Sequence, residues 1–278
     1  MAGKLYLCAT PIGNLGDITA RTLECLKQAD IIAAEDTRNS MKLMTHFDIH
    51  TPLTSYHEFN KYDKADKLVE ELSAGKNIAL ITDAGTPAIS DPGEVLVQKC
   101  QAAGIEVTSL PGPSAAITAL TLSGLSTRRF AFEGFLPRDK GERREILEEL
   151  KGEYRTVVLY EAPHHLRETL ADLNILFSER RLTIARELTK KHEEILNFTV
   201  GEANAYYEKT EPRGEFVLVL EGRDRERDEM EKREAFENLS PGEHVEKYIK
   251  MGMSKKEAMK QAAKDRGVSK RDIYNALL

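Results

Sequence analysis

The stretch ALITDAGTPAISDPG, residues 79–93, brings together side chains suited to binding one small polar molecule. A short apolar run is followed at once by polar and turn-forming residues, which is typical of a buried parallel strand that feeds a loop. In open α/β sheets, ligands bind just outside the carboxyl ends of the strands. The carboxylate of Asp83, the hydroxyl of Thr86 and the backbone amides around Gly85 could all face such a ligand. The alternative interpretation is a tight strand-to-helix connection with Asp91 as the N-cap.

Five other segments have a similar composition and follow expected strand ends or turns. Each contains small or polar residues that permit a close approach of the backbone to a ligand, and together they indicate a substrate cleft. The first lacks the G-x-G-x-x-G and G-x-x-x-x-G-K-[ST] spacings, so binding of a dinucleotide or a triphosphate is weakly supported. The segments are TPIGNLGD (10–17), EDTR (35–38), PGPSAA (111–116), EAPHH (161–165) and ARELTKKHEE (185–194).

Alternation of strands and helices over the first 110 residues predicts a parallel, doubly wound sheet that would position these loops. The expected strands are 4–10, 31–34, 51–55, 78–82 and 105–109, and the expected helices are 19–28, 40–47, 61–73 and 93–103.

Beyond Gly124 strands follow one another more often, which predicts a mixed α/β sheet. We expect strands at 130–135, 156–161, 181–186, 194–198 and 214–220, and helices at 142–150, 166–177 and 202–208. The predicted organisation is an N-terminal α/β lobe at 1–118, a second α/β lobe at 119–222 and an extension at 223–278, with the boundary between the lobes at about 115–125 and a cleft between them.

The predicted extension begins with alternating charge at 223–237, which indicates an exposed linker or a charged helix. Helical patterns follow at 241–250, 254–265 and 269–277. Ser-x-x-Glu from Ser254 and Ser-x-x-Asp from Ser269 are capping-box openings for the last two. These short helices are typical of a helix-turn-helix that contacts nucleic acid, and equally of a packed helical appendage.

Composition predicts a cytosolic protein with a substantial hydrophobic core. The 278 residues are 41% hydrophobic and 31% charged, and no apolar run approaches the roughly 18 residues that a bilayer requires. The amino terminus lacks the apolar core of a signal peptide. Three widely spaced cysteines, without metal-ligand spacing, predict reduced structural thiols. The net charge of −6 disfavours a generic nucleic-acid binder, although local basic clusters can still contact phosphate or be solvated surface.

Seven segments in chain order carry a family resemblance: TPIGNLGDIT, AAEDTR, ITDAGTPAISDPG, LPGPSAAITAL, FEGFLPR, YEAPHHL and ARELTKKHEE. Together they resemble the bacterial 16S ribosomal RNA ribose 2′-O-methyltransferase I family, which has the tetrapyrrole-methylase fold. The resemblance runs from about residue 3 to 221, and the helical tail is similar to that of the longer members. The first and third segments differ from the GxGPGD and GDP loops of the porphyrinoid branch.

The resemblance implies a cytoplasmic homodimer that uses S-adenosylmethionine to methylate the ribose of a cytidine in the decoding region of the small ribosomal subunit. It also implies that the methyl donor lies in the cleft between two α/β lobes. Four of the cofactor-binding residues named below have an alternative role: core packing for Ile12, Ala115 and Leu188, and stabilisation of a turn for Asp83. Carried over by position, the cofactor-binding residues are Pro11, Ile12, Asp83, Thr86, Ser114, Ala115, Glu161, Ala162, Leu188 and Gly214.

A ribose hydroxyl is a weak nucleophile, so its methylation calls for a general base or for groups that stabilise developing alkoxide. His57 has a reference pKa near neutrality and suits a base, with a structural role as the alternative. No single base is assigned. The candidates are Glu35, Asp36, Arg38 and His57, with Glu187 and Lys190 facing them from the second lobe.

RNA contact is expected at two basic clusters, since phosphate contacts give salt-dependent affinity. They contain Arg128, Arg129, Arg138, Lys140, Arg143 and Arg144, and in the tail Lys255, Lys256, Lys264, Lys270 and Arg271. No metal is expected, because His164 and His165 are adjacent and would point apart on a helix. The alternative functions are methylation of a tetrapyrrole precursor and non-enzymatic binding to the ribosome.

Overall fold

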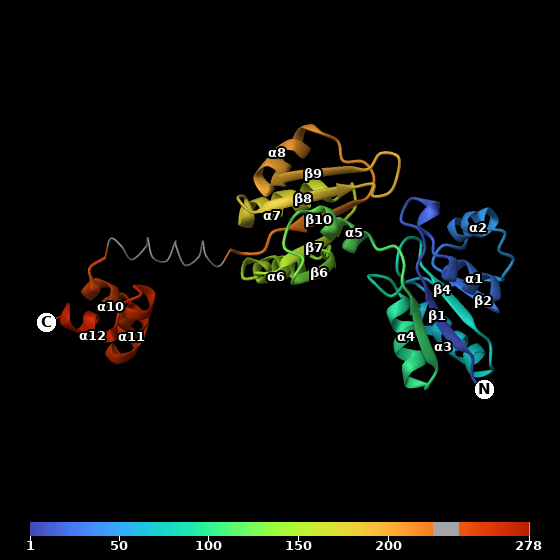
Figure 1. The fold of residues 1–278 in the computed structure, drawn as a ribbon, viewed down its shortest axis with the longest axis horizontal. Helices are drawn as coiled ribbons and strands as arrows, with labels where there is room; N and C mark the ends of the chain where they lie inside the picture. The colour runs from blue at the N-terminus through green and yellow to red at the C-terminus, as the bar shows by residue number, and fades with distance from the viewer. Residues whose placement is uncertain (225–238, 278) are drawn as a thin grey trace. The chain divides into compact units, whose positions relative to one another are not determined.

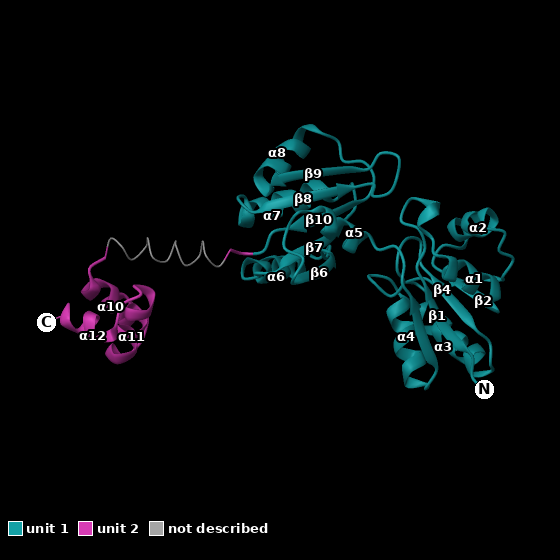
Figure 2. Cartoon of the chain, in the orientation of Figure 1, with its two compact units in different colours: residues 1–222 teal, residues 223–278 magenta. Residues whose placement is uncertain are grey.

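The computed structural model describes residues 1–224 and 239–277 and divides into two compact units, Met1–Gly222 and Arg223–Leu278 (Figure 2). Each unit is described by itself. Most of the charged segment expected at 223–237 lies outside the described residues.

The first sheet is wholly parallel, as predicted, with strand order β3-β2-β4-β1-β5 (Figure 1). Its strands are β1 (Lys4–Cys8), β2 (Ile31–Ala34), β3 (Leu53–Ser55), β4 (Ile78–Ile81) and β5 (Glu106–Leu110). The helices between them are α1 (Ala20–Gln28), α2 (Thr37–His46), α3 (Lys61–Ser73) and α4 (Gly93–Ala102), with a 3-10 turn, η1, at Leu15–Asp17.

Both faces of this sheet are buried. Side chains of a strand alternate between faces, so Ile78 and Leu80 of β4 join the core beneath α3 and α4, whereas Ala79 and Ile81 join the core beneath α1 and α2. The central strand β4 is therefore apolar throughout. Parallel strands end at one edge of the sheet, which gathers the loops after β1, β2, β4 and β5 there.

Helix α2 begins at Thr37, three residues before the predicted start. The Asp36 side chain caps it by accepting a hydrogen bond from the Arg38 backbone N–H at 2.8 Å. The EDTR segment is therefore a strand end, a cap and a first helical turn, and not an open loop. The cap fixes the directions of Asp36 and Arg38.

The second sheet is mixed, as predicted, with order β6-β7-β10-β8-β9. Only the β6–β7 pair is parallel. Its strands are β6 (Phe130–Phe135), β7 (Thr156–Glu161), β8 (Arg181–Arg186), β9 (Glu194–Thr199) and β10 (Phe216–Leu220). One face packs against α6 (Lys140–Lys151), α7 (Leu166–Phe177) and α8 (Val200–Lys209).

Helix α5 (Ala115–Leu122), which no helical pattern predicted, covers the other face of the second sheet. Its residues AAITALTL are apolar almost throughout, so no 3.6-residue periodicity reveals the helix. Ala116, Ala119 and Leu120 pack with Val217 and Val219 of β10. Figure 1 shows α5 between the two sheets.

Strand β6 contains a bulge between Phe132 and Gly134, where the register with β7 shifts. Gly134 has φ +64°, a conformation that glycine adopts without strain. On a regular strand Phe132 and Phe135 would face opposite sides. The bulge instead brings both rings to Tyr160 of β7, with ring centroids 5.0 and 5.6 Å from it.

The C-terminal unit contains α10 (Pro241–Lys250), α11 (Lys255–Asp265) and α12 (Lys270–Asn275), which share a small apolar core. The predicted capping boxes of Ser254 with Glu257 and Ser269 with Asp272 are both present, and Ser240 forms a third with Glu243. Across the described part of the chain, every helix is too short or too polar to span a bilayer.

Candidate active site

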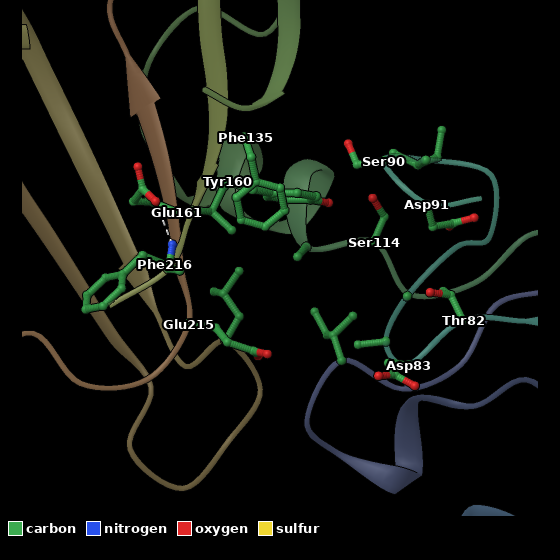
Figure 3. Close-up of a pocket in the computed structure, with 18 of the residues that line it drawn as sticks. Thr82, Asp83, Ser90, Asp91, Ser114, Phe135, Tyr160, Glu161, Glu215 and Phe216 are labelled. Atoms are coloured by element: carbon green, nitrogen blue, oxygen red, sulfur yellow. Dashed lines mark hydrogen bonds between the residues drawn. The ribbon is translucent and has the colours of Figure 1, made fainter. Parts of the chain in front are cut away.

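A pocket of about 480 Å³ is enclosed by loops at the carboxyl ends of the first sheet and by residues of the second sheet (Figure 3). Thr82, Asp83, Ser90, Asp91 and Ser114 lie on one side, and Glu161, Glu215 and Phe216 lie on the other. Pockets of this size at such an edge are typical small-molecule sites. The substrate cleft predicted from the loops therefore has a physical counterpart.

The loop after β4 is held by backbone pairing with the loop after β1. Thr10 and Gly85 exchange two backbone hydrogen bonds of 2.9 and 3.0 Å, and Thr86 Oγ1 donates to the Pro113 carbonyl at 2.9 Å. Within this loop Ala88 and Ser90 have positive φ, at 66° and 59°. Such non-glycine conformations are uncommon and cluster at functional sites.

Asp91 organises the end of this loop. Its Oδ1 accepts hydrogen bonds from the backbone N–H groups of Ala88 (3.0 Å) and Gly93 (2.7 Å), whereas Pro92 occupies the N-cap position expected for Asp91. Asp91 Oδ2 is enclosed at the pocket and makes no hydrogen bond within the described residues. A buried carboxylate oxygen without a donor is costly, which favours the protonated form of Asp91.

Carboxylates make this side of the pocket negative. Glu35 Oε2 accepts a hydrogen bond from Thr82 Oγ1 at 2.7 Å, and Asp83 Oδ1 accepts one from the Asp36 N–H at 3.2 Å. Burial, followed by the nearby charge of Glu35, raises the pKa of Asp83 above its ordinary value. Burial also raises the pKa of Asp91. The arrangement favours a cationic ligand or one rich in hydrogen-bond donors.

Replacing Asp91 with Asn should change how stability depends on pH. Because the pKa of Asp91 is higher in the folded protein than in the unfolded chain, its protonated carboxyl favours the folded state at low pH. This contribution to the free energy of unfolding is lost as the pH rises from about 4 through the raised pKa. Asn keeps an oxygen acceptor and does not ionise. In ligand-free thermal unfolding, we expect the Tm of Asp91→Asn minus that of the wild type to be more positive at pH 7 than at pH 4. A difference independent of pH would contradict this reasoning.

The opposite wall rests on Glu161, which is buried at the end of β7. Glu161 Oε1 accepts a hydrogen bond from the Ala162 N–H at 2.8 Å, and Oε2 accepts one from Thr169 Oγ1 of α7. Arg143 of α6 donates to the same Thr169 oxygen at 2.9 Å and to Asp172 at 2.6 Å. A relay from Arg143 through Thr169 therefore fixes the carboxylate of Glu161 beside the pocket.

A strained loop after β8 forms the floor of the pocket. Glu187 and Thr189 have φ of 50° and 64°. Lys190 Nζ binds Glu187 Oε1 at 2.9 Å and Glu215 Oε2 at 2.8 Å. Burial alone would raise the pKa of Glu187, but the Lys190 ammonium and the Glu215 N–H hold it below its ordinary value. Leu188 and Glu215 line the pocket.

Glycine permits the loop after β1 to approach this floor closely. A Cβ on Gly13 would lie 2.4 Å from Lys190 Cγ and 2.9 Å from the Leu188 carbonyl oxygen. Both distances are shorter than van der Waals contact, so only glycine fits without a shift of the floor. The loops of the two sheets therefore meet directly below the pocket.

Most cofactor-binding residues that the family resemblance implied line this one pocket. Pro11 lies in a neighbouring cavity with Thr82 and Asp83, and Gly214 lies outside the lining, next to Glu215. The predicted residues that the pocket brings together are Ile12, Asp83, Thr86, Ser114, Ala115, Glu161, Ala162 and Leu188.

Of the six catalytic candidates, only Glu35 lines the pocket. Asp36 and Arg38 bind each other, and the Arg38 side chain is 89% exposed. His57 follows the edge strand β3, where its backbone N–H donates to Asn60 Oδ1 at 2.8 Å. The structure does not bring His57 to the pocket, because an edge strand ends away from β4 and β1. Glu187 and Lys190 lie behind Glu215, in the ion-pair network.

Two further predictions differ from the structure. Arg143, expected at an RNA-contacting surface, has a side chain only 11% exposed and is held by Asp172 and Thr169. His164 and His165 precede α7, which begins at Leu166, and their rings lie 4.2 Å apart instead of pointing apart. Neither His belongs to a cluster of three or more potential metal ligands in the described chain.

Several residues of the pocket are not predicted by the sequence. Tyr160 and Phe135 come from strand interiors or ends in the second sheet, and Glu215 and Phe216 come from the start of β10. For Asp91 the sequence predicts only a helix cap. The one available signal was Gly134, an isolated glycine inside a strand pattern, which indicates a bulge or a close backbone approach.

Comparisons with known proteins agree with this architecture. The family model for Tetrapyrrole (Corrin/Porphyrin) Methylases matches residues 4–204. The chain is 52% identical over 98% of its length to ribosomal RNA small subunit methyltransferase I of Halalkalibacterium halodurans, covering 94% of that protein. It is 48% identical over 99% of its length to the protein of the same name from Bacillus subtilis, again covering 94%.

Solved structures show the same fold at low identity. Uroporphyrin-III C-methyl transferase from Thermus thermophilus, complexed with S-adenyl homocysteine, has a TM-score of 0.57 and 17% identity. The match covers 79% of this chain and 97% of that one. The predicted two-lobed tetrapyrrole-methylase fold is thereby confirmed. The chain belongs to the tetrapyrrole methylase family and, within it, to the ribosomal RNA small subunit methyltransferase I family.

Proposed function

We propose that this protein uses S-adenosylmethionine to methylate the ribose 2′-hydroxyl of a cytidine in 16S ribosomal RNA, within the small ribosomal subunit. It acts as a cytoplasmic homodimer whose two catalytic lobes are residues 1–118 and 119–222. The observation that carries the proposal is the pocket between the two sheets, which has carboxylates on both walls and aromatic rings on the wall from the second sheet. This pocket occurs in a chain that matches small-subunit ribosomal RNA methyltransferases over nearly its whole length.

The residues of the pocket suit this methyl donor. When bound, S-adenosylmethionine supplies an electrophilic methyl group on a positively charged sulfonium. The carboxylates of Asp83 and Asp91 favour a cation nearby. Apolar side chains exclude water from the remainder of the pocket, namely Ile12, Ala115, Leu188 and Val217.

Methyl transfer to a hydroxyl depends on alignment and on removal of the hydroxyl proton. Glu35 is the candidate base, because it is the pocket-lining member of the predicted catalytic set. The hydrogen bond from Thr82 to Glu35 Oε2 orients the carboxylate. Lys190 acts as a positioning residue, since its ammonium holds Glu215, which lines the pocket, against Glu187.

RNA phosphates bind to exposed cations in this proposal. Arg128, Arg129, Arg138, Lys140 and Arg144 are exposed on the larger unit. Lys255, Lys256, Lys264, Lys270 and Arg271 are exposed on the C-terminal unit. Selectivity then comes from the shape of the assembled subunit and from an extruded nucleotide.

The neighbours Arg143 and Arg144 provide a matched test, because Arg143 is assigned a structural role and Arg144 a contact with RNA phosphate. Arg143→Ala should lower the free energy of unfolding by about 1–3 kcal/mol, because Thr169 and Asp172 lose a charged donor. Arg144→Ala should change it by less than about 0.5 kcal/mol. Conversely, Arg144→Ala should reduce the slope of log affinity against log salt by about 1, whereas Arg143→Ala should not. Urea denaturation and RNA titrations at several salt concentrations measure both. A loss of stability in Arg144→Ala, or a reduced salt slope in Arg143→Ala, would contradict these roles.

The function is tested by transfer of a tritiated methyl group from the donor to small subunits that lack the modification, followed by nucleoside analysis. We expect label on a 2′-O-methylcytidine, and micromolar donor affinity by calorimetry. Label on a base, or on a porphyrinoid and not on RNA, would overturn the substrate assignment. Absence of donor binding would favour a non-enzymatic ribosome binder. Sedimentation at micromolar concentration tests the homodimer.

A further inference from the structure

A second cavity of about 330 Å³ adjoins the main pocket and shares Phe135, Glu161 and Ala162 with it. Four charged or titratable side chains that do not line the main pocket belong to this cavity, namely Arg138, Arg143, His165 and Glu168. Its walls come from the end of β6, the following segment and the start of α7. The donor pocket does not account for it.

An aromatic ring lies between the two cavities. The Phe135 side chain is 55% exposed, and its ring centroid is 5.6 Å from that of Tyr160 at an angle of 57°. The register shift of the β6 bulge turns the Phe135 ring to this side of the sheet. Gly134 also approaches Ser90 closely, because a Cβ on Gly134 would lie 2.8 Å from Ser90 Oγ. An exposed ring supported from beneath is the kind of platform on which unpaired RNA bases stack.

A free cation lies three residues further along the chain. Arg138 is exposed, and no hydrogen bond or ion pair joins it to the described residues. Arg143, the other arginine of the cavity, is committed to Asp172 and Thr169. Arg138 is therefore the guanidinium that a phosphate can reach without breaking an existing pair.

The remaining wall can donate and accept hydrogen bonds. His165 Nδ1 lies 3.8 Å from Glu168 Oε2, too far for a hydrogen bond, and its Nε2 has no partner in the described chain. No hydrogen bond within the described residues therefore satisfies Nε2 of this imidazole, which lines the cavity. Imidazole and carboxylate groups together complement the donor and acceptor edge of a pyrimidine.

We propose that this second cavity receives the base of the nucleotide whose ribose is methylated, with Phe135 stacking on the base, His165 contacting its edge and Arg138 holding an adjacent phosphate. The inference rests on the proposed function and names the substrate subsite of the same reaction. An extruded base in this cavity would place its ribose beside the main pocket, because the two cavities share a wall.

A third cavity, of about 230 Å³, lies on the other flank of the main pocket and shares Thr82 and Asp83 with it. It contains Lys42, which donates to Asn39 Oδ1 at 3.4 Å, but no aromatic side chain. Without a stacking ring it is the weaker base site. Lys42→Gln therefore serves as the matched control for Arg138→Gln, since each removes one cation from one flanking cavity.

The test measures methyl transfer to unmethylated small subunits by Phe135→Leu, Arg138→Gln, His165→Ala and Lys42→Gln. We expect Phe135→Leu to lower kcat/KM by about 10- to 100-fold through loss of stacking. Arg138→Gln should raise KM for subunits by about 3- to 10-fold, and Lys42→Gln should change it by less than about 2-fold. Donor affinity, measured by calorimetry, should stay within about 2-fold for Arg138→Gln and His165→Ala, because neither residue lines the main pocket.

Subunits carrying uridine at the target position test contact with the base edge. His165→Ala should narrow the ratio of kcat/KM for cytidine over uridine by about 5-fold or more, which loss of folding alone would not do. If the wild type methylates subunits but the cavity variants match Lys42→Gln, or if the cytidine preference is unchanged in His165→Ala, the base subsite is wrong and the proposed function stands. If the wild type transfers no methyl group to RNA, both are wrong.

Discussion

Gly214→Ala is expected to lower the free energy of unfolding by roughly 2–5 kcal/mol. Gly214 has φ +86°, which strains any residue with a Cβ. The added methyl would also lie 2.5 Å from Glu187 Cγ and 2.6 Å from Glu187 Oε1. Glu187 cannot move aside without breaking its contacts with Lys190 and the Glu215 N–H. The substitution should therefore also weaken donor binding, since Glu215 lines the pocket.

Gly152→Ala is the matched control for this substitution. Gly152 has φ −88°, and a Cβ there would lie 3.7 Å from the Glu149 carbonyl oxygen, an ordinary contact. We expect a change of less than about 1 kcal/mol. Urea denaturation followed by circular dichroism measures both variants. Equal stabilities of the two would show that the Glu187 network tolerates displacement.

Glu35→Gln is expected to slow the single-turnover rate of methyl transfer by about 10²- to 10⁴-fold, the range of general-base catalysis. Gln retains the size of Glu35 and can still accept the hydrogen bond from Thr82 Oγ1, so the shape of the pocket should persist. Donor affinity should therefore fall much less than the rate. The measurement is quench-flow with saturating donor and excess enzyme, with calorimetry for the donor.

His57→Ala provides the comparison, because His57 was the candidate with the more suitable reference pKa but does not line the pocket. We expect a change of less than about threefold in the same single-turnover rate. A drop of only severalfold for Glu35→Gln would remove Glu35 from the chemistry. A large drop for His57→Ala at unchanged stability would return His57 to it.

Local pattern was sufficient to predict most of the fold. The strands at 31–34, 130–135, 156–161 and 181–186 and the helices at 61–73 and 166–177 have the predicted bounds, because each is an apolar run or a periodic pattern that polar or turn-forming residues delimit. The start of α2 was misplaced because Asp36 caps the helix from within an apparent loop. Helix α5 was missed because nearly every residue in it is apolar.

Residues of the candidate site in loops were predictable, whereas side chains that reach it from strands of the second sheet were not. Asp83, Thr86 and Ser114 belong to loops after parallel strands, and the rule that such loops meet at one edge was enough to group them. Phe135 and Tyr160 reach the pocket through a bulge and through packing between the two sheets, which depend on contacts far apart in sequence. Arg143 could not be separated from its exposed neighbour Arg144, because the difference lies in the tertiary partners Asp172 and Thr169.

The extra residue at the β6 bulge also matters for comparing relatives of this chain. Phe132 and Phe135 are three positions apart, and both rings lie on the Tyr160 side of the sheet only because the bulge adds one residue, Glu133, that has no partner in β7. A relative that lost a single residue here would keep every neighbouring motif and a high overall identity, yet its second ring would turn away from both cavities. The presence or absence of this extra residue, more than conservation of either ring, should therefore distinguish homologues that share the substrate from those that share only the fold.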